Sequence, residues 1–118
     1  DAILCFDASL LEGRLLAAAG PRTLIVVNSA RSAAEFATSL PGRRIVPIDG
    51  LAISRRNGLG RIVNSALLGA LARAIEAPAL DVLERTLIDN APKQHDENIA
   101  ACVEGWRTAD TLLQAAAA

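Results

Sequence analysis

The amino-acid sequence predicts an α/β domain, with a parallel sheet flanked by helices and a helical C-terminal part. Three short apolar runs rich in β-branched residues predict the strands, over Ala2–Phe6, Thr23–Val27 and Arg44–Ile48. The first two runs are separated by a stretch long enough for the crossover helix that parallel strands require. Because three strands make a thin sheet with exposed edges, we expect residues 1–118 to be the later part of a single, incomplete domain. Further strands are expected from a preceding N-terminal strand and loop that are missing here.

Six helical segments are expected between and after the strands, on the basis of capping residues, breakers and apolar spacing. Asp7 and Ser9 offer caps for the first helix, Phe36 is expected to face inward from the second, and Pro92 is expected to end the fifth. The alanine tail over residues 115–118 is expected to fray or to be weakly helical. The predicted helices cover residues 9–19, 31–40, 51–55, 60–75, 80–90 and 96–114. The last two carry apolar stripes, formed by Leu80, Leu83, Leu87 and Ile88 and by Ile99, Cys102, Val103 and Trp106.

The composition excludes several classes of function. Aromatic residues make up 3% of the chain, so stacking platforms for single-stranded nucleic acid are not expected, and a net charge of −1 argues against a polyanion-binding surface. No apolar run approaches the ~20 residues that cross a bilayer. Cys5 and Cys102 lie far apart and form no cluster for zinc or iron–sulfur, so we expect buried free thiols, which fit a reducing cytoplasm. His95 is the only histidine and is expected on the surface, so we predict no catalytic residue and no metal ligand.

The segment Gly58–Leu71 is the best candidate for a functional site. Gly58 and Gly60 can turn the chain tightly and leave backbone amides free at the start of the next helix, where Arg61 would add charge for a phosphate group. Arg55 and Arg56 lie close by in the sequence. The alternative is a core helix that follows a tight turn, beside a solvated basic face. Ile62, Ala66, Leu67 and Gly69 are expected to be buried, with Gly69 as a notch for close packing. Asn64 and Ser65 are the only polar residues between Ile62 and Ala72.

Polar residues also follow the predicted strands, where α/β folds gather their ligands. Asn28 and Ser29 could donate hydrogen bonds to a ligand, although an Asx turn also explains them. Asp7 and Asp49 occupy similar positions, and helix capping explains Asp7 equally well.

These pieces together resemble the gamma subunit, or gamma domain, of the 2-oxoacid:ferredoxin (acceptor) oxidoreductases, which act on pyruvate, 2-oxoglutarate, branched-chain ketoacids or indolepyruvate. The resemblance runs in order through nearly all of the chain. Many members have Gly-Asn before the central helix where this chain has Gly58-Leu59. The similar stretches are residues 1–7, Thr23–Ser29, Val46-Pro47, Leu51-Ala52, the set Arg61, Asn64, Leu68, Gly69 and Ala70, and the pair Asn98 and Gly105.

The resemblance implies a Rossmann-like component of a cytoplasmic complex that oxidatively decarboxylates a 2-oxoacid to acyl-CoA and CO2. It implies alpha, beta and delta partner subunits or domains that carry thiamine diphosphate, Mg and iron–sulfur clusters, with ferredoxin or another electron acceptor. This part would assist coenzyme A binding and assembly, with Gly58, Gly60, Arg61, Asn64, Asn28 and Ser29 as candidate binding residues, and is not expected to be catalytic alone. The alternative is a stand-alone Rossmann-like ligand-binding or regulatory domain. A nucleotide-dependent dehydrogenase is a third possibility, but its Gly-x-Gly-x-x-Gly fingerprint is absent here.

Overall fold

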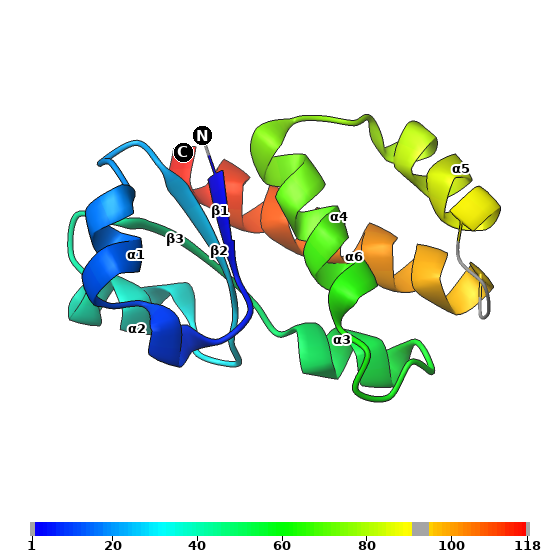
Figure 1. Cartoon of the computed structure of the whole chain (residues 1–118), viewed down its shortest axis with the longest axis horizontal. Coiled ribbons are helices and arrows are strands. Elements are labelled where there is room, and N and C mark those ends of the chain that lie inside the picture. The colour runs from blue at the N-terminus through cyan, green and yellow to red at the C-terminus, as the bar shows by residue number, and fades with distance from the viewer. Residues whose placement is uncertain (1, 91–94, 118) are drawn as a thin grey trace.

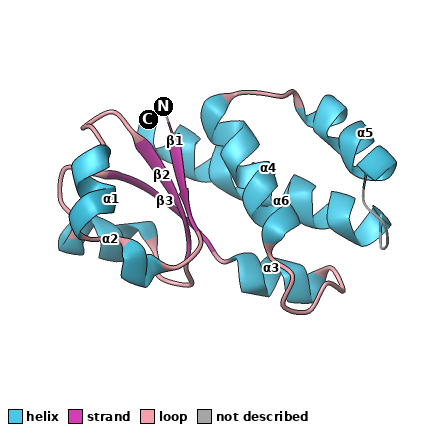
Figure 2. Ribbon diagram, viewed as in Figure 1, coloured by secondary structure: helices cyan, strands magenta, loops and turns pink. Residues whose placement is uncertain are grey.

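The computed structural model describes residues 2–90 and 95–117 and contains a three-stranded parallel sheet. Its strands are β1 (Ala2–Cys5), β2 (Leu24–Asn28) and β3 (Arg44–Ile48), in the order β1-β2-β3 (Figure 2). Both neighbouring pairs are parallel. The predicted α/β class and the parallel pairing of the first two strands are therefore confirmed.

Helices cover both faces of this sheet (Figure 1). On one face lie a short 3₁₀ helix, η1 (Ala8–Leu10), with α1 (Gly13–Ala18) and α2 (Ala33–Ser39). On the other face lie α4 (Asn64–Ile75) and the long C-terminal helix α6 (His95–Ala117). Two more helices, α3 (Gly50–Arg56) and α5 (Leu80–Asn90), lie beyond the sheet and pack against α4 and α6.

The central strand β2 shows why the sheet needs helices on both sides. Its residues Leu24 and Val26 join the core beneath α4 and α6, whereas Ile25 and Val27 join the core beneath α1 and α2. Successive strand residues point to opposite faces, so a run that is apolar at every position must be buried on both. Phe36 completes the second core with 1% of its surface exposed, as its position in the predicted helix suggested.

The helices α4 and α6 cross at glycines. An added Cβ at Gly69 would overlap the carbonyl oxygen of Cys102, and one at Gly105 would overlap the carbonyl oxygen of Ala66. Each helix thus presents a glycine to the backbone of the other helix. On each helix, the residue that contacts the other helix's glycine lies three positions from that helix's own glycine. The prediction that Gly69 is a close-packing notch is confirmed, and the burial of Ala66 and Leu67 is confirmed as well.

Three predicted helices differ from the structure in continuity or by more than two residues, whereas the other predicted bounds agree to within two residues. The helix expected over residues 9–19 is split into η1 and α1, because Gly13 takes a left-handed conformation with φ of 50°. The helix expected from Gly60 begins instead at Asn64, and Ile62 is 53% exposed rather than buried. Gly60 has φ of 60°, which no right-handed helix contains, and the buried side chain of the loop is Leu59. The last helix runs on to Ala117, as the high helix propensity of alanine favours.

Several smaller expectations are settled by the same structure. Asp7 caps η1, since its Oδ1 accepts a hydrogen bond from the Ser9 amide at 2.9 Å. Cys5 and Cys102 are both buried free thiols, as expected. Pro92 and the side chain of Ile88 lie outside the described residues. Within the described ranges, no helix has the length and apolar character of a membrane span, and no group of three or more His, Cys, Asp or Glu side chains is placed to hold a metal ion.

Candidate functional site

The carboxyl ends of β2 and β3 are braced by polar side chains. Asn28 Oδ1 accepts a hydrogen bond from the Gly50 amide at 3.0 Å, which ties the end of β2 to the start of α3. Asp49 caps α3 by accepting from the Ala52 amide at 3.0 Å. The Asx turn expected at Asn28 is therefore replaced by a contact with a residue far along the chain. Ser29 does form a local turn, in which its Oγ accepts from the Arg31 amide at 3.1 Å.

Gly50 joins these braces to the beginning of α4. A Cβ at Gly50 would lie 2.9 Å from Asn28 Oδ1 and 3.2 Å from the Cβ of Val63. Only glycine leaves room for the strand end and the residue before Asn64 to meet there. The structure thus brings Asn28 close to the first turn of α4, as a site at the carboxyl edge of the sheet requires.

The loop between α3 and α4 is held by its own hydrogen bonds. The Leu59 amide donates to the Ser54 carbonyl at 2.8 Å, and the buried Ser54 hydroxyl donates to the Ile62 carbonyl at 2.6 Å. Gly58 has φ of 76°, so both glycines turn the chain as the sequence suggested. Because the amides of Gly58, Leu59 and Ile62 are engaged within the loop, the backbone donors without a hydrogen bond among its described residues are at Gly60, Arg61 and Val63.

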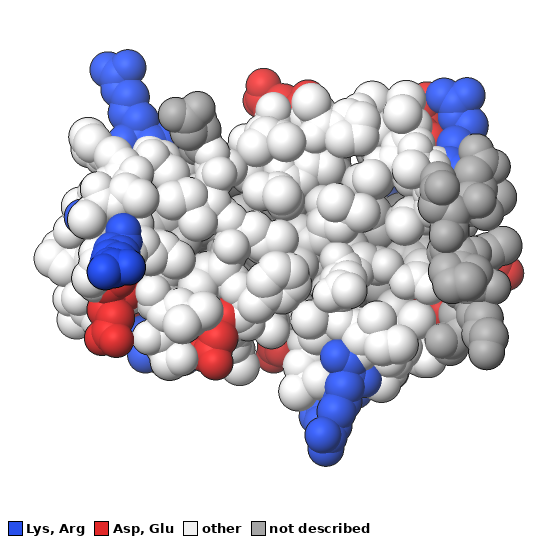
Figure 3. Space-filling view, in the orientation of Figure 1, with Lys and Arg blue, Asp and Glu red and all other residues white. Residues whose placement is uncertain are grey.

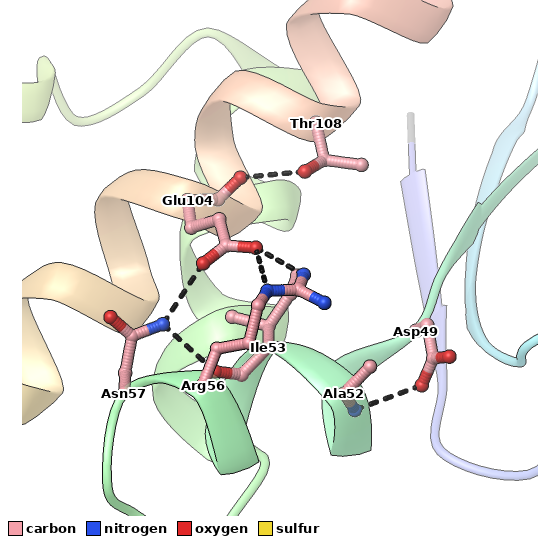
Figure 4. Close-up of polar contacts among 7 residues, drawn as sticks. All are labelled: Asp49, Ala52, Ile53, Arg56, Asn57, Glu104 and Thr108. Carbon is pink, nitrogen blue, oxygen red and sulfur yellow. Dashed lines mark hydrogen bonds and ion pairs between the residues drawn. The ribbon is translucent and has the colours of Figure 1, made fainter.

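A three-residue contact joins α3 to α6, and we call Arg56, Asn57 and Glu104 the latch (Figure 4). Arg56 Nε donates to Glu104 Oε2 at 3.0 Å, and Asn57 Nδ2 donates to Glu104 Oε1 at 3.0 Å. The Asn57 Nδ2 also donates to the Ile53 carbonyl at 2.8 Å. Burial alone would raise the pKa of Glu104, but the hydrogen bonds from Arg56 and Asn57 outweigh it and hold this pKa below its ordinary value.

The three arginines that the sequence places near the glycines differ in their partners. Arg56 is committed to Glu104, whereas Arg55 and Arg61 are exposed to solvent. Figure 3 shows basic side chains projecting from this end of the molecule, over the region of α3. An anion at this end would therefore meet Arg55 and Arg61 and the free amides of Gly60 and Arg61, rather than a cluster of three arginines.

An apolar cleft of about 330 Å³ adjoins the first turn of α4. Val63, the residue before α4, provides no side-chain cap for that turn. Ser65 donates its hydroxyl to Asn98 Oδ1, a contact that fastens the beginning of α4 to α6. The cleft is lined by Leu4, Phe6, Asn64, Ser65, Leu68 and Leu87. This arrangement can bind an apolar group beside the helix start, and it contains no general base or nucleophile with an adjacent partner.

Sequence reasoning missed the latch. Glu104 lies 48 residues from Arg56, and no local pattern links the two positions. The local signal for Asn57 is weak: Asn and Gly at the end of a helix often satisfy its last carbonyls, but this does not point to a partner on α6. The side chain of His95, at the start of α6, lies outside what the structure describes.

The fold is that of a Rossmann-like α/β domain, with polar side chains at the carboxyl edge of its parallel sheet. Residues 1–108 match the family described as pyruvate ferredoxin/flavodoxin oxidoreductase, and the chain belongs to that family. The resemblance found from the sequence is thereby confirmed. The solved structure of pyruvate oxidoreductase subunit PORC from Thermotoga maritima has the same fold, with a TM-score of 0.76 and 23% sequence identity over 90% of this chain. The chain spans 61% of that subunit's length, and no match was found among curated proteins.

Proposed function

We propose that this chain is the later part of a gamma component of a thiamine-dependent 2-oxoacid:ferredoxin (acceptor) oxidoreductase. The observation that carries the proposal is the family match over residues 1–108, which includes the sheet, the latch and most of α6. In this role the chain assists coenzyme A binding and subunit assembly in a cytoplasmic complex that converts a 2-oxoacid to acyl-CoA. Neither Cys5 nor Cys102 fits an iron–sulfur cluster, because the two thiols are buried in different cores. The clusters, the thiamine diphosphate and its Mg ion are therefore assigned to the partner subunits.

Among the candidate binding residues that the sequence suggested, those in the loop before α4 fit a phosphate of coenzyme A best. Arg61 is exposed, its amide and that of Gly60 are free, and Arg55 is exposed on the preceding helix. Guanidinium groups bind phosphate through charge-assisted hydrogen bonds, and free amides add further donors. Asn64 lines the adjacent apolar cleft, which would receive an apolar portion of the same ligand. Asn28 and Ser29 would support this site from the strand end rather than touch the phosphate.

The direct test replaces Arg61 by Ala in the reconstituted complex and measures methyl viologen reduction against coenzyme A concentration. Loss of a hydrogen bond to a charged group should weaken coenzyme A binding by roughly 1.5–3 kcal/mol, or about tenfold to a hundredfold. Arg14→Ala, an exposed arginine in α1 on the opposite face of the sheet, is the matched control. An unchanged coenzyme A dependence in a folded and assembled Arg61→Ala complex would reduce Arg61 to a surface charge.

The surface over β1 and α4 supports the assembly role. Figure 3 shows few charges on this face, and Phe6 and Ile75 are 52% and 50% exposed. Leu68, at 39% exposure, lines the same cleft as Phe6 and lies on α4, as Ile75 does. Among the described residues, β1 pairs only with β2, so its outer edge has unpaired backbone groups. We therefore propose that this surface is covered by the rest of the domain and its partner subunits.

Co-purification tests that proposal. The full-length protein should purify with subunits that carry thiamine and a brown iron–sulfur chromophore, and Leu68→Glu should reduce their yield. Leu10→Glu changes a 57% exposed leucine on the opposite side of the sheet and should leave the yield unchanged. A full-length protein that is a stable monomer, without genes for such subunits nearby, would instead favour a stand-alone ligand-binding domain.

A further inference from the structure

Asn57 of the latch is followed by glycine, and an Asn-Gly dipeptide is prone to loss of the asparagine side-chain amide. Asn57 is the residue that ends α3, and Gly58 follows it. The side-chain amide of an asparagine hydrolyses most readily when glycine comes next, because glycine has no Cβ to obstruct its backbone nitrogen. The chain contains four other described asparagines, and none of them precedes a glycine.

We infer that Asn57 is a deamidation site that Glu104 protects, and that its conversion to a carboxylate opens the latch. In the reaction, the Gly58 backbone nitrogen loses its proton to solvent and bonds to Cγ of Asn57. The bond from Cγ to Nδ2 breaks, and Nδ2 leaves as ammonia after taking up a proton. Water then opens the resulting five-membered imide at either carbonyl, to give aspartate or isoaspartate at position 57. The overall change consumes one water and releases one ammonia, and it requires no other reagent.

Hydrogen bonds in the folded structure restrain both reacting groups. Attack requires the Asn57 side chain to turn so that Cγ faces the next backbone nitrogen. That side chain is instead held by two hydrogen bonds from Nδ2, to the Ile53 carbonyl and to Glu104 Oε1. The Gly58 amide, in turn, points back at the Arg55 carbonyl at 3.4 Å. Glu104 is the contact from outside α3, so its removal leaves the Asn57 side chain held by the Ile53 carbonyl alone and makes its rotation easier.

The product changes the charge at the point where α3 meets α6. A carboxylate at position 57 loses the donor that faced Glu104 Oε1 and places two negative charges where a 3.0 Å hydrogen bond had been. The new carboxylate also competes with Glu104 for the Arg56 guanidinium. The side chain of Glu97, whose Cγ lies near Gly58, adds a third acidic group beside the turn. The loop that carries Gly60 and Arg61 begins at this turn, so deamidation loosens that loop as well.

The first experiment measures deamidation by mass spectrometry of digests from the whole chain, incubated folded at mildly alkaline pH and physiological temperature. Glu104→Ala should speed the reaction at Asn57 about tenfold over the parent, the effect of losing one hydrogen bond to a charged group on a local opening equilibrium. Glu12→Ala, which removes an exposed glutamate elsewhere, should leave the rate unchanged. Equal rates in the parent and a folded Glu104→Ala protein would overturn the inference.

The second experiment examines the product and does not depend on how well Glu104→Ala folds. Asn57→Asp should lower the thermal midpoint more than Asn57→Ala, because it adds charge repulsion to the loss of the hydrogen bond. Combining Asn57→Asp with Glu104→Gln should recover part of that loss, since the repelling carboxylate is gone. If Asn57→Asp is as stable as Asn57→Ala, the charge at this position does not open the latch and the inference is wrong.

Discussion

Replacement of Gly69 by Ala places a methyl group at the point where α4 and α6 cross. The added Cβ overlaps the main-chain carbonyl of Cys102, which cannot rotate aside as the end of a side chain can. Overpacking of this kind costs roughly 1–3 kcal/mol. An interior Gly→Ala change in a helix returns at most about 1 kcal/mol through helix propensity. Because the obstructing atom belongs to the backbone, we expect a cost near the upper end of that range and a net loss of about 2 kcal/mol.

Urea unfolding, followed by fluorescence and by far-UV circular dichroism, measures this loss. Trp106 is the single tryptophan and lies beside Gly105 on α6, so its emission reports on the separation of the two helices. The control is Gly20→Ala, where the nearest atom to the new Cβ is Thr23 Oγ1 at an ordinary 3.7 Å. Its effect should stay within about 0.5 kcal/mol.

Equal or greater stability for Gly69→Ala would refute the reasoning, because it would leave only the gain in helix propensity. Gly105→Ala should cost a similar amount, since its Cβ overlaps the carbonyl of Ala66. The double variant should cost less than the two single changes together, because one separation of the helices relieves both overlaps.

Three further predictions concern single groups. Burial raises the pKa of Cys102 to about 11, so its thiol should resist alkylation in the native protein at mildly alkaline pH and react once urea unfolds the chain. The hydrogen bond from Arg73 Nε, at 2.6 Å, lowers the pKa of Asp110. The ionised Asp110 carboxylate therefore stabilises the fold above its unfolded-state pKa, and this stabilisation is lost as the pH falls through its folded-state pKa. Asp110→Asn should flatten that part of the acid unfolding curve. Gly50→Ala should destabilise the fold by about 1–3 kcal/mol in urea unfolding. If the same change costs as much in an Asn28→Ala background as in the parent, the clash with Asn28 Oδ1 is not its cause.

The elements whose signals are local were predictable from the sequence. The third strand was predicted at its observed bounds, Arg44–Ile48, because an apolar run lies between a Pro-Gly turn and a capping aspartate. The second helix was predicted with Phe36 facing inward, and the structure adds that Ser32 caps it. The role of Gly69 also followed from its place among apolar residues, where a glycine inside a helix usually has a packing reason.

Features that depend on distant residues were not predictable. The start of α4 was placed at Gly60, because nothing in the local pattern shows that Leu59 is buried by the tertiary fold while Ile62 is left exposed. Arg56 appeared to belong to an anion-binding cluster because the sequence does not reveal Glu104 as its partner. Similarly, the sequence predicted a local turn at Asn28, whereas its side-chain oxygen accepts a hydrogen bond from the Gly50 amide. In each case a contact across the fold outweighs the local preference.

The glycine crossing of α4 and α6 also dictates an order of events during synthesis. The core beneath α1 and α2 is made from residues 3 to 45, so all of its members are synthesised before α4 and α6. The core beneath α4 needs Ala101 and Ala109 from α6, and the notch at Gly69 has no backbone to receive until Cys102 is made. Until α6 is made, a nascent chain therefore carries one core that is complete and an α4 whose apolar face is uncovered. The second core closes only after α6 has been added.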